Sequence, residues 1–182
     1  MPYSSDVFDE FLKAQLALWN YKRYLDVGCG AGKYGRMIRD LVPDSHITGI
    51  EVDNEYIEAF RLRRTYDEVI NASVESVLGG PQAVTYDVVV FGDVIEHLRK
   101  SDGIDALHFF VYRCKRMIVV YPSKYIQYDI NGKAHESHRS VWTPQDFLPF
   151  AGDLTTNGHM NLAIIQGYLD DNDAVYPTGK PW

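Results

Sequence analysis

A glycine-rich stretch between Arg23 and Gly35 constrains the fold of this chain more than any other part of the sequence. A short apolar run ends there in an acidic residue, Asp26, and glycines follow at positions 28, 30, 32 and 35. A helical pattern then runs from Tyr34 to Leu41. This order predicts a strand, a tight loop and a helix, because glycine permits positive φ and a close approach of ligand to backbone. We therefore expect the loop to bind a nucleotide-like ligand.

Two phosphate-binding loops share part of this pattern. A Walker loop requires Gly-Lys followed by Ser or Thr, whereas Lys33 is followed by Tyr34 here. A dinucleotide-binding loop could use the glycines at positions 30, 32 and 35, with Glu51 as acceptor of ribose hydroxyls. That interpretation places the carboxylate of Asp26 close to two phosphates. The sequence therefore favours a ligand that lacks phosphate and has a cationic amino acid end.

Strands and helices alternate along most of the chain. The predicted strands that follow the glycine loop are His46–Glu51, Val69–Ala72, Asp87–Gly92 and Arg116–Tyr121. The other predicted helices are Ser5–Asn20, Asn54–Arg64 and Gly103–Arg113. The predicted strands Asp87–Gly92 and Arg116–Tyr121 are apolar almost throughout, as strands buried on both faces must be. This alternation predicts a parallel sheet between two layers of helices, with ligands at the carboxyl ends of the strands where the strand order reverses.

The pattern changes after Pro122. A polar loop leads to a predicted helix at Thr143–Phe150, with Thr143 as its N-cap and Pro144 in its first turn. A last strand is predicted at Leu162–Leu169, and we expect it to pair antiparallel with residues 153–158. Residues 170–182 contain acids and two prolines without any period, and they indicate no element.

Length and composition indicate one ordinary globular domain over residues 1–182, with 46% hydrophobic and 24% charged residues. The net charge of −7 disfavours long contacts with a nucleic acid backbone. No apolar run approaches the roughly 20 residues that span a bilayer, and the first residues are unlike a signal peptide. We expect a cytoplasmic protein. Cys29 lies in the glycine loop and Cys114 beside a predicted core strand, so we expect no disulfide.

The order Asp-x-Gly-x-Gly-x-Gly, followed by Glu51 at the end of the next predicted strand, resembles the first motif of the class I S-adenosylmethionine-dependent methyltransferases. The resemblance implies an α/β fold, a Rossmann-like three-layer αβα sandwich. Its seven-stranded sheet would be mostly parallel, with an antiparallel C-terminal hairpin. The implied cofactor is S-adenosylmethionine. The residues implied to bind it are Asp26, Gly28, Cys29, Gly30, Gly32, Glu51, Val52, Asn71, Ala72, Ser73 and Asp93.

Two of these residues, Glu51 and Asn71, have roles that the resemblance specifies. Glu51 would accept both ribose hydroxyls, with a solvated acid at a strand end as the alternative. Asp53 is more typical of a cap on the following helix. The side chain of Asn71 would accept a hydrogen bond from the adenine amino group, although the family usually has Asp at this position. Asn can accept through its amide oxygen, and a plain turn at 71–73 is the alternative.

The residues Gly92 to Leu98 resemble the fourth motif of many small-molecule methyltransferases. In that motif Asp93 would lie under the cofactor, and His97 would begin the next helix facing the substrate. Histidine can act as a general base near neutral pH, although His97 could merely orient the backbone. His138 lies four residues before Trp142, on a loop that must cross the strand ends, and is the second candidate base.

Asp93, Glu96, His97 and His138 also suggest a metal site. Two carboxylates and two imidazoles could hold a divalent ion such as Mg²⁺ or Mn²⁺. Asp-x-x-Glu-His, followed by His-x-x-x-Trp-Thr, resembles the metal site of the small-RNA 3′-end 2′-O-methyltransferases, in which the first acid is usually Glu. Our primary prediction assigns no metal ligand.

The sequence thus predicts a methyltransferase that acts on an oxygen or nitrogen nucleophile of a small molecule by in-line transfer. His97 or His138 would remove the acceptor proton. Nucleic acid and membrane are not expected as partners, and a homodimer could complete the open site of so short a chain. The second hypothesis is a metal-dependent RNA 3′-end 2′-O-methyltransferase. The third is a cofactor-binding partner subunit without chemistry of its own.

Overall fold

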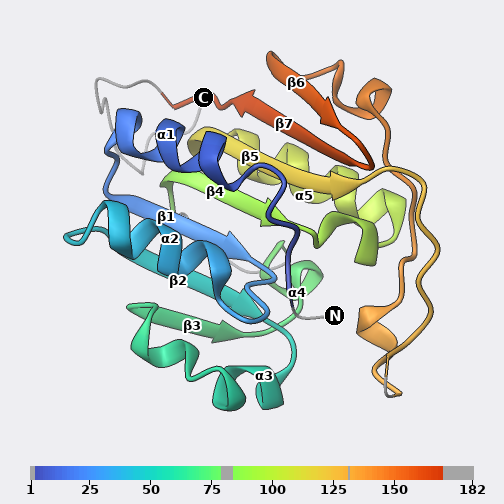
Figure 1. The fold of residues 1–182 in the computed structure, drawn as a ribbon, viewed down its shortest axis with the longest axis horizontal. Helices are drawn as coiled ribbons and strands as arrows, with labels where there is room; N and C mark the ends of the chain where they lie inside the picture. The colour runs from blue at the N-terminus through green and yellow to red at the C-terminus, as the bar shows by residue number, and fades with distance from the viewer. Residues whose placement is uncertain (1–2, 79–83, 131, 170–182) are drawn as a thin grey trace, which may run out of the picture.

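A seven-stranded sheet runs through the molecule, with helices on both of its faces (Figure 1). The computed structural model describes residues 3–78, 84–130 and 132–169. The strands are β1 Arg23–Val27, β2 His46–Glu51, β3 Glu68–Asn71, β4 Tyr86–Gly92, β5 Cys114–Pro122, β6 Gly152–Asn157 and β7 Met160–Gln166. Their spatial order is β3-β2-β1-β4-β5-β7-β6. The first five are parallel, and β7 is antiparallel to both of its neighbours, which confirms the predicted fold class.

Helices cover the two faces of the sheet (Figure 1). The α-helices are α1 Asp9–Trp19, α2 Lys33–Leu41, α3 Asn54–Ala59, α4 Val74–Leu78 and α5 Lys100–Val111. Four short 3₁₀ segments are η1 Leu62–Arg64, η2 Ile95–His97, η3 Ala134–Glu136 and η4 Pro144–Phe147. Residues of α1, α2 and α3 share one hydrophobic cluster with the sheet, and residues of α4 and α5 share the other.

The two hydrophobic clusters meet at the central strands β4 and β5. Val88 and Val90 point to the cluster of α1 and α2, whereas Val89 and Phe91 point to that of α5, and all four are fully buried. A strand with both faces covered must be apolar at every position, which explains the continuous run seen in the sequence.

The strand order reverses at β1, which lies between β2 and β4. The chain moves outward from β1 through β2 to β3 and then crosses back to β4. The carboxyl ends of β1 and β4 lie side by side, since Val27 pairs in register with Phe91. A crevice opens at such a switch point because the following loops diverge to opposite sides.

Three predicted helices differ in extent from those of the structure. The helix expected at 54–64 ends at Ala59, because Arg61 adopts a left-handed φ of +52° and turns Leu62 into the core. The helix expected at 5–20 begins only at Asp9, and its Phe11 is exposed. The element expected at 143–150 is the 3₁₀ segment η4. Its capping box, between Thr143 and Asp146, confirms the predicted helix start.

Smaller differences include the helix predicted at Gly103–Arg113, which is α5 at Lys100–Val111. Helix α4 was not predicted, since five residues are too few to show a helical period. The last strand ends at Gln166 rather than at residue 169. Cys29 and Cys114 are both buried and free. Among the described residues, no helix is both long and apolar enough to cross a bilayer.

Gly92, the last residue of β4, is tightly enclosed. A Cβ added there would lie 1.8 Å from Cε2 of Tyr34, a buried residue of α2. We expect Gly92→Ala to lower the free energy of unfolding by about 2–4 kcal/mol, because the ring of Tyr34 must move within a packed core. Urea denaturation would measure the loss. The control is Gly158→Ala, where a Cβ meets nothing within 4 Å and only the positive φ opposes it. Equal losses in both variants would contradict the expectation.

Candidate active site

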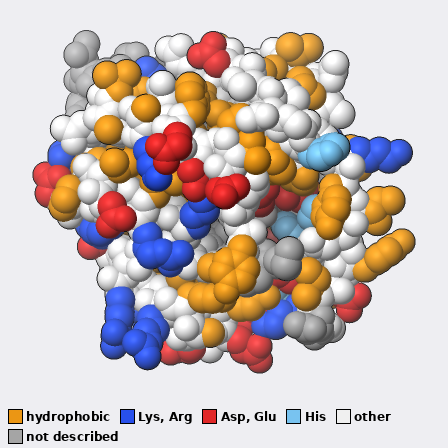
Figure 2. Space-filling model, viewed as in Figure 1, with side chains coloured by type: hydrophobic (Ala, Val, Ile, Leu, Met, Phe, Trp, Pro, Cys, Tyr) orange, Lys and Arg blue, Asp and Glu red, His pale blue; other side chains and the backbone are white. Residues whose placement is uncertain are grey.

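Two adjoining cavities lie at the carboxyl ends of the strands. The first has a volume of about 270 Å³ and the second about 540 Å³. Asp93 and His97 line both cavities. Figure 2 shows a recess on this face in which acidic and histidine side chains lie together, with hydrophobic side chains at its edge. The two cavities therefore form one composite site with a shared wall.

The glycine loop forms one wall of the first cavity. Gly28, Gly30 and Gly32 all have positive φ, between +48° and +79°. A Cβ at Gly28 would lie 2.3 Å from a methyl carbon of Val94, so only glycine fits between β1 and the loop after β4. Gly28 and Gly30 line the cavity, whereas Gly32 is the N-cap of α2 and lies against Leu62.

Glu51 is held rigidly at the end of β2. Its Oε2 accepts a hydrogen bond from the N–H of Gly30 at 2.8 Å, and its Oε1 accepts one from the N–H of Asp53 at 2.9 Å. The residue is 4% exposed, and burial raises the pKa of its carboxyl group. Each oxygen keeps a second lone pair, so the carboxyl group can still accept two hydroxyls of a ligand. Asp53 accepts from the N–H of Glu55 at 2.8 Å and caps α3, as predicted.

The structure brings most predicted cofactor residues together in the first cavity. Those that line it are Gly28, Gly30, Glu51, Val52, Ala72, Ser73 and Asp93. Asp26, Cys29, Gly32 and Asn71 lie outside its lining and support it from behind. Asn71 donates through its amide nitrogen to the backbone oxygens of Glu51 and Val52, at 2.8 and 3.1 Å, and so fixes the turn after β2.

Asp26 is the most deeply buried of these supports. Its Oδ2 accepts a hydrogen bond of 2.6 Å from the hydroxyl of Tyr66, and only 1% of the residue is exposed. Burial raises the pKa of Asp26 to about 7, although the hydrogen bond from Tyr66 opposes the shift. The carboxyl group thus titrates near neutral pH, beneath the loop that it supports.

Several residues of the first cavity were not identified from the sequence as its lining. They are Ser4, Ile50, Tyr56, Val74, Glu75, Gly92, Val94, Leu98, His135, Glu136 and Arg139. His135, Glu136 and Arg139 belong to the segment 123–142, which we call the strap. The hydroxyl of Tyr56 donates to Oε1 of Glu136 at 2.7 Å, and Lys133 contacts Asp53, so the strap is attached to the start of α3. The polar run from His135 to Arg139 was the sequence signal that could have found these residues.

Most of the charged side chains around the first cavity are acidic. Glu51, Glu75, Asp93 and Glu136 line it, and Arg139 is the one Lys or Arg among the described residues of its lining. An acidic lining disfavours a pyrophosphate and favours a ligand with positive charge. The cavity therefore fits the predicted sulfonium nucleoside better than a dinucleotide.

Asp93 occupies the junction of the two cavities. Its φ is +54°, which is uncommon for a residue other than glycine. Oδ2 of Asp93 accepts the N–H of Ser5 at 2.9 Å. Burial raises the pKa of Asp93 to about 6. The side chain is thus fixed beneath the point where ligands of the two cavities would meet.

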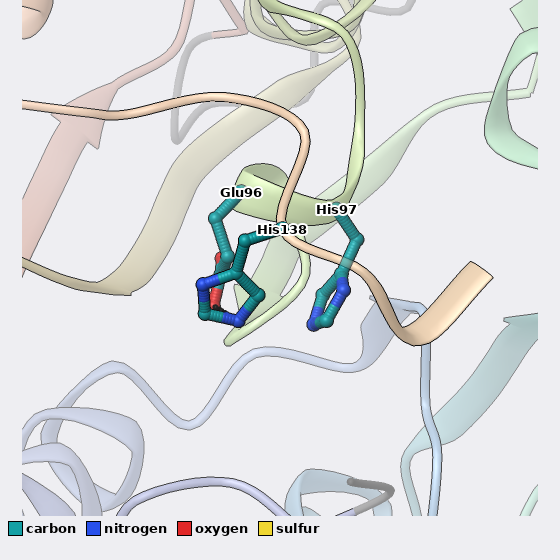
Figure 3. A group of neighbouring side chains, drawn as sticks. All are labelled: Glu96, His97 and His138. Carbon is teal, nitrogen blue, oxygen red and sulfur yellow. Dashed lines mark ion pairs between the residues drawn. The ribbon is translucent and has the colours of Figure 1, made fainter. Parts of the chain in front are cut away.

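Two histidine rings meet at the second cavity (Figure 3). The ring centroids of His97 and His138 are 4.8 Å apart, with an interplanar angle of 88°. Nδ1 of His97 lies 3.3 Å from the oxygen of Ser137, and Nδ1 of His138 lies 3.1 Å from the oxygen of Tyr125. Because a carbonyl can only accept, both Nδ1 atoms carry hydrogen, which makes Nε2 the proton acceptor in each neutral ring.

Burial lowers the pKa of both histidines. The pKa of His97 is lowered to about 4, and the neighbouring His138 adds to the effect of burial. The pKa of His138 also lies below its usual value. Both rings are therefore neutral at pH 7 and able to accept a proton.

Glu96 lies beneath His138 and is 3% exposed (Figure 3). Its Oε1 is 4.0 Å from Nε2 of His138, and its Oε2 has no hydrogen-bond partner among the described residues. Burial raises the pKa of Glu96 well above its usual value. One ligand atom from each of Glu96, His97 and His138 can be chosen so that all lie within 4.8 Å of one another.

Comparison with known families identifies the chain. The family model described as "Methyltransferase domain" matches residues 25–117, which include the glycine loop, Glu51 and His97. The chain belongs to this family. It is a class I S-adenosylmethionine-dependent methyltransferase, and S-adenosylmethionine is its cofactor. Membership disfavours the third hypothesis, a partner subunit without chemistry.

Solved structures share the fold of this methyltransferase. An O-methyltransferase family protein from Burkholderia thailandensis is 11% identical with a TM-score of 0.62, over 88% of this chain and 56% of that one. The methyltransferase domain of bacterial CtHen1-C is 19% identical with a TM-score of 0.63, over 86% and 95%. The N-methyltransferase NodS from Bradyrhizobium japonicum is 16% identical with a TM-score of 0.60, over 90% and 99%. The chain thus spans little more than half of the first protein's length. No curated protein matches the chain in sequence.

The buried acid beneath the glycine loop makes a prediction about stability. The pKa of Asp26 is raised from 3.8 to about 7 in the folded chain, so the folded state binds a proton more tightly than the unfolded state. Its contribution is therefore present below pH 4 and is lost as the pH rises through 7. The unfolding free energy of Asp26→Asn minus that of wild type should therefore be about 2–4 kcal/mol higher at pH 8 than at pH 4. Urea denaturation at both values measures this.

Asp87→Asn is a control of opposite sign. Burial alone would raise the pKa of Asp87, but hydrogen bonds from Lys115 and from two backbone N–H groups lower it. Because the folded pKa lies below the usual 3.8, this variant should lose stability relative to wild type as the pH rises to about 4 and should change little between pH 5 and pH 8. A pH-independent difference between wild type and Asp26→Asn would contradict the expectation.

Proposed function

We propose that this methyltransferase binds S-adenosylmethionine in the first cavity and a small-molecule acceptor, with an oxygen or nitrogen nucleophile, in the second. The observation that carries the proposal is the shared wall at Asp93 and His97. A methyl donor and an acceptor on its two sides would meet there. The cofactor supplies a methyl group on a positively charged sulfur, which leaves as a neutral thioether.

The residues of this chain would align and deprotonate the acceptor. In the transfer, the carbon–sulfur bond breaks as the bond from carbon to the acceptor atom forms, and the electron pair of the broken bond stays on sulfur. The proton of the acceptor passes to Nε2 of His97 or His138. Alignment by the cavity walls supplies most of the rate gain, because proximity and orientation can contribute roughly 7–11 kcal/mol.

The two histidines give a direct test. We expect His97→Ala and His138→Ala each to lower turnover about 100-fold, the usual contribution of a general base, with S-adenosylmethionine affinity changed less than about threefold. Formation of S-adenosylhomocysteine on a panel of phenols, alcohols and amines measures turnover, and calorimetry measures affinity. His46→Ala, at the exposed start of β2, is the control. An unchanged rate in both variants would remove the histidines from the mechanism.

The pH profile tests the same assignment. Since His97 has a pKa of about 4, it stays neutral down to about pH 5. The rate should therefore hardly change between pH 6 and pH 8 and should fall below about pH 5. A fall centred between about 6 and 6.5 would indicate that another group controls the rate, either an ordinary exposed histidine or Asp93, whose pKa is raised to about 6.

The group of Glu96, His97 and His138 favours a second candidate, the metal-dependent RNA 3′-end 2′-O-methyltransferase. The residues fit a divalent ion: both imidazoles are neutral, their Nε2 atoms are available, and Oε2 of Glu96 is buried without a partner among the described residues. Asp93 is not part of this group, and its carboxylate accepts the N–H of Ser5. A bound ion would supply charge to polarise the acceptor hydroxyl.

Metal removal separates the two candidates. If the second is right, calorimetric titration with Mn²⁺ should show binding to wild type, weakened at least tenfold in Glu96→Gln, and EDTA should abolish methylation of a short RNA 3′ end. If the first is right, EDTA should leave methylation of the small acceptor unchanged. His46→Ala again controls for loss of a surface imidazole.

The other expectations from the sequence remain predictions. They are a single domain over residues 1–182, a cytoplasmic location, no nucleic acid or membrane partner, and a homodimer that completes the open site.

A further inference from the structure

Residues Tyr3 to Ser5 lie ahead of α1, at the boundary between the two cavities. Ser4 lines the first cavity, whereas Tyr3 and Ser5 line the second. Neighbouring residues of this segment thus belong to different cavities, as expected where successive side chains point to opposite sides of a non-helical backbone. The segment is therefore part of the wall that separates them.

Three hydrogen bonds hold this segment in place. The hydroxyl of Ser4 donates to the backbone oxygen of Gly92 at 3.1 Å, and the N–H of Ser5 donates to Oδ2 of Asp93 at 2.9 Å. The ammonium group of Lys33 donates to the backbone oxygen of Ser5. The first two bonds attach the segment to the end of β4, and the third attaches it to the start of α2.

Lys33 makes a second contact that strengthens the attachment. Its Nζ lies 2.5 Å from Oδ1 of Asp9 in the first turn of α1, and both side chains are only about one-fifth exposed. An ion pair with so little exposure is screened less than one on the open surface. The lysine that gives the glycine loop its partial likeness to a Walker loop thus binds the N-terminal segment in this structure.

We propose that Tyr3–Ser5 is the partition between methyl donor and acceptor, that Ser4 contacts the donor, and that Tyr3 and Ser5 contact the acceptor. Lys33 is the positioning residue that keeps the partition in place. The inference rests on the proposed function for the identity of the two ligands. It adds that adjacent residues of one short segment serve different substrates, so their substitutions should have separable effects.

Cysteine protection tests the alternation. Ser4→Cys and Ser5→Cys form a matched pair, because both positions are half-buried. The native Cys29 and Cys114 are 6% and 0% exposed and give only a slow background. Modification by a methanethiosulfonate reagent, followed by intact mass, is measured with and without saturating S-adenosylhomocysteine. We expect the ligand to slow modification at least tenfold in Ser4→Cys and less than threefold in Ser5→Cys. Equal protection at both positions, or none at either, would overturn the partition.

Substitution of Lys33 tests the positioning role. Without ligand, Lys33→Met should speed modification of both cysteines at least fivefold, while Lys33→Arg should restore the slow rate. Lys13→Met is the control, because Lys13 also pairs with an acid in the first turn of α1, Glu10, but does so on the exposed face of that helix. Thermal melting verifies that each variant is folded. An unchanged rate in folded Lys33→Met would refute the role of Lys33.

These outcomes are separate from those of the proposed function. The ligand-free rates do not depend on which molecule fills either cavity. Binding of S-adenosylhomocysteine to wild type, measured by calorimetry, establishes that the first cavity can be probed. If it binds and the histidine variants keep full activity, the proposed base fails while the partition stands. If it binds and protects both cysteines alike, the partition fails and the methyl transfer stands.

Discussion

The site depends on the carboxyl group of Glu51 and the two backbone N–H groups that hold it. One N–H comes from Gly30 in the loop after β1 and the other from Asp53 at the start of α3. A buried carboxylate without donors would be strongly destabilising, so these bonds offset its desolvation and join three segments at one point. The glycine loop, Glu51 as the proposed ribose acceptor, and the first turn of α3 are therefore positioned together.

The strap follows the carboxyl end of β5 and completes the site at that edge of the sheet. Trp142, which is 1% exposed, anchors its last residues, because its indole N–H donates to Ile95 and Ser140. Nearer the middle of the strap, Glu136 accepts a hydrogen bond from the hydroxyl of Tyr56. His138 lies between these attachments and is thereby placed against His97. A residue of a long loop is thus held in a fixed position, as its proposed role of proton acceptor requires.

The sequence predicted the parts of the site that have a local signal. Apolar runs that alternate with helical patterns predicted the parallel strands, and the glycine spacing followed by Glu51 predicted the first cavity. The His97 motif was recognisable for the same reason, since its residues are neighbours in the chain. His138 was suggested only because its loop had to cross the strand ends.

What could not be predicted depends on partners far away in the chain. The hydroxyl of Tyr66 that meets Asp26 comes from 40 residues later, and that of Tyr56 meets Glu136 across 80 residues. Neither pair leaves a periodic pattern. Asn71 was expected to act through its amide oxygen on a ligand, yet its amide nitrogen is bound to the backbone after β2. The break of the helix near Arg61 likewise follows from burial of Leu62, which only the folded core can demand.

The long separation of the strap from its partners has a consequence for the order of assembly. Loop-closure entropy grows with the number of residues enclosed, so the contact between Tyr56 and Glu136 is costlier to form than those within the β1–α2–β2 unit. The glycine loop, Glu51 and the start of α3, which form one part of the first cavity, can take shape from the first half of a nascent chain. The two histidines that we propose as proton acceptors come together only when the strap has folded back onto the ends of the earlier strands.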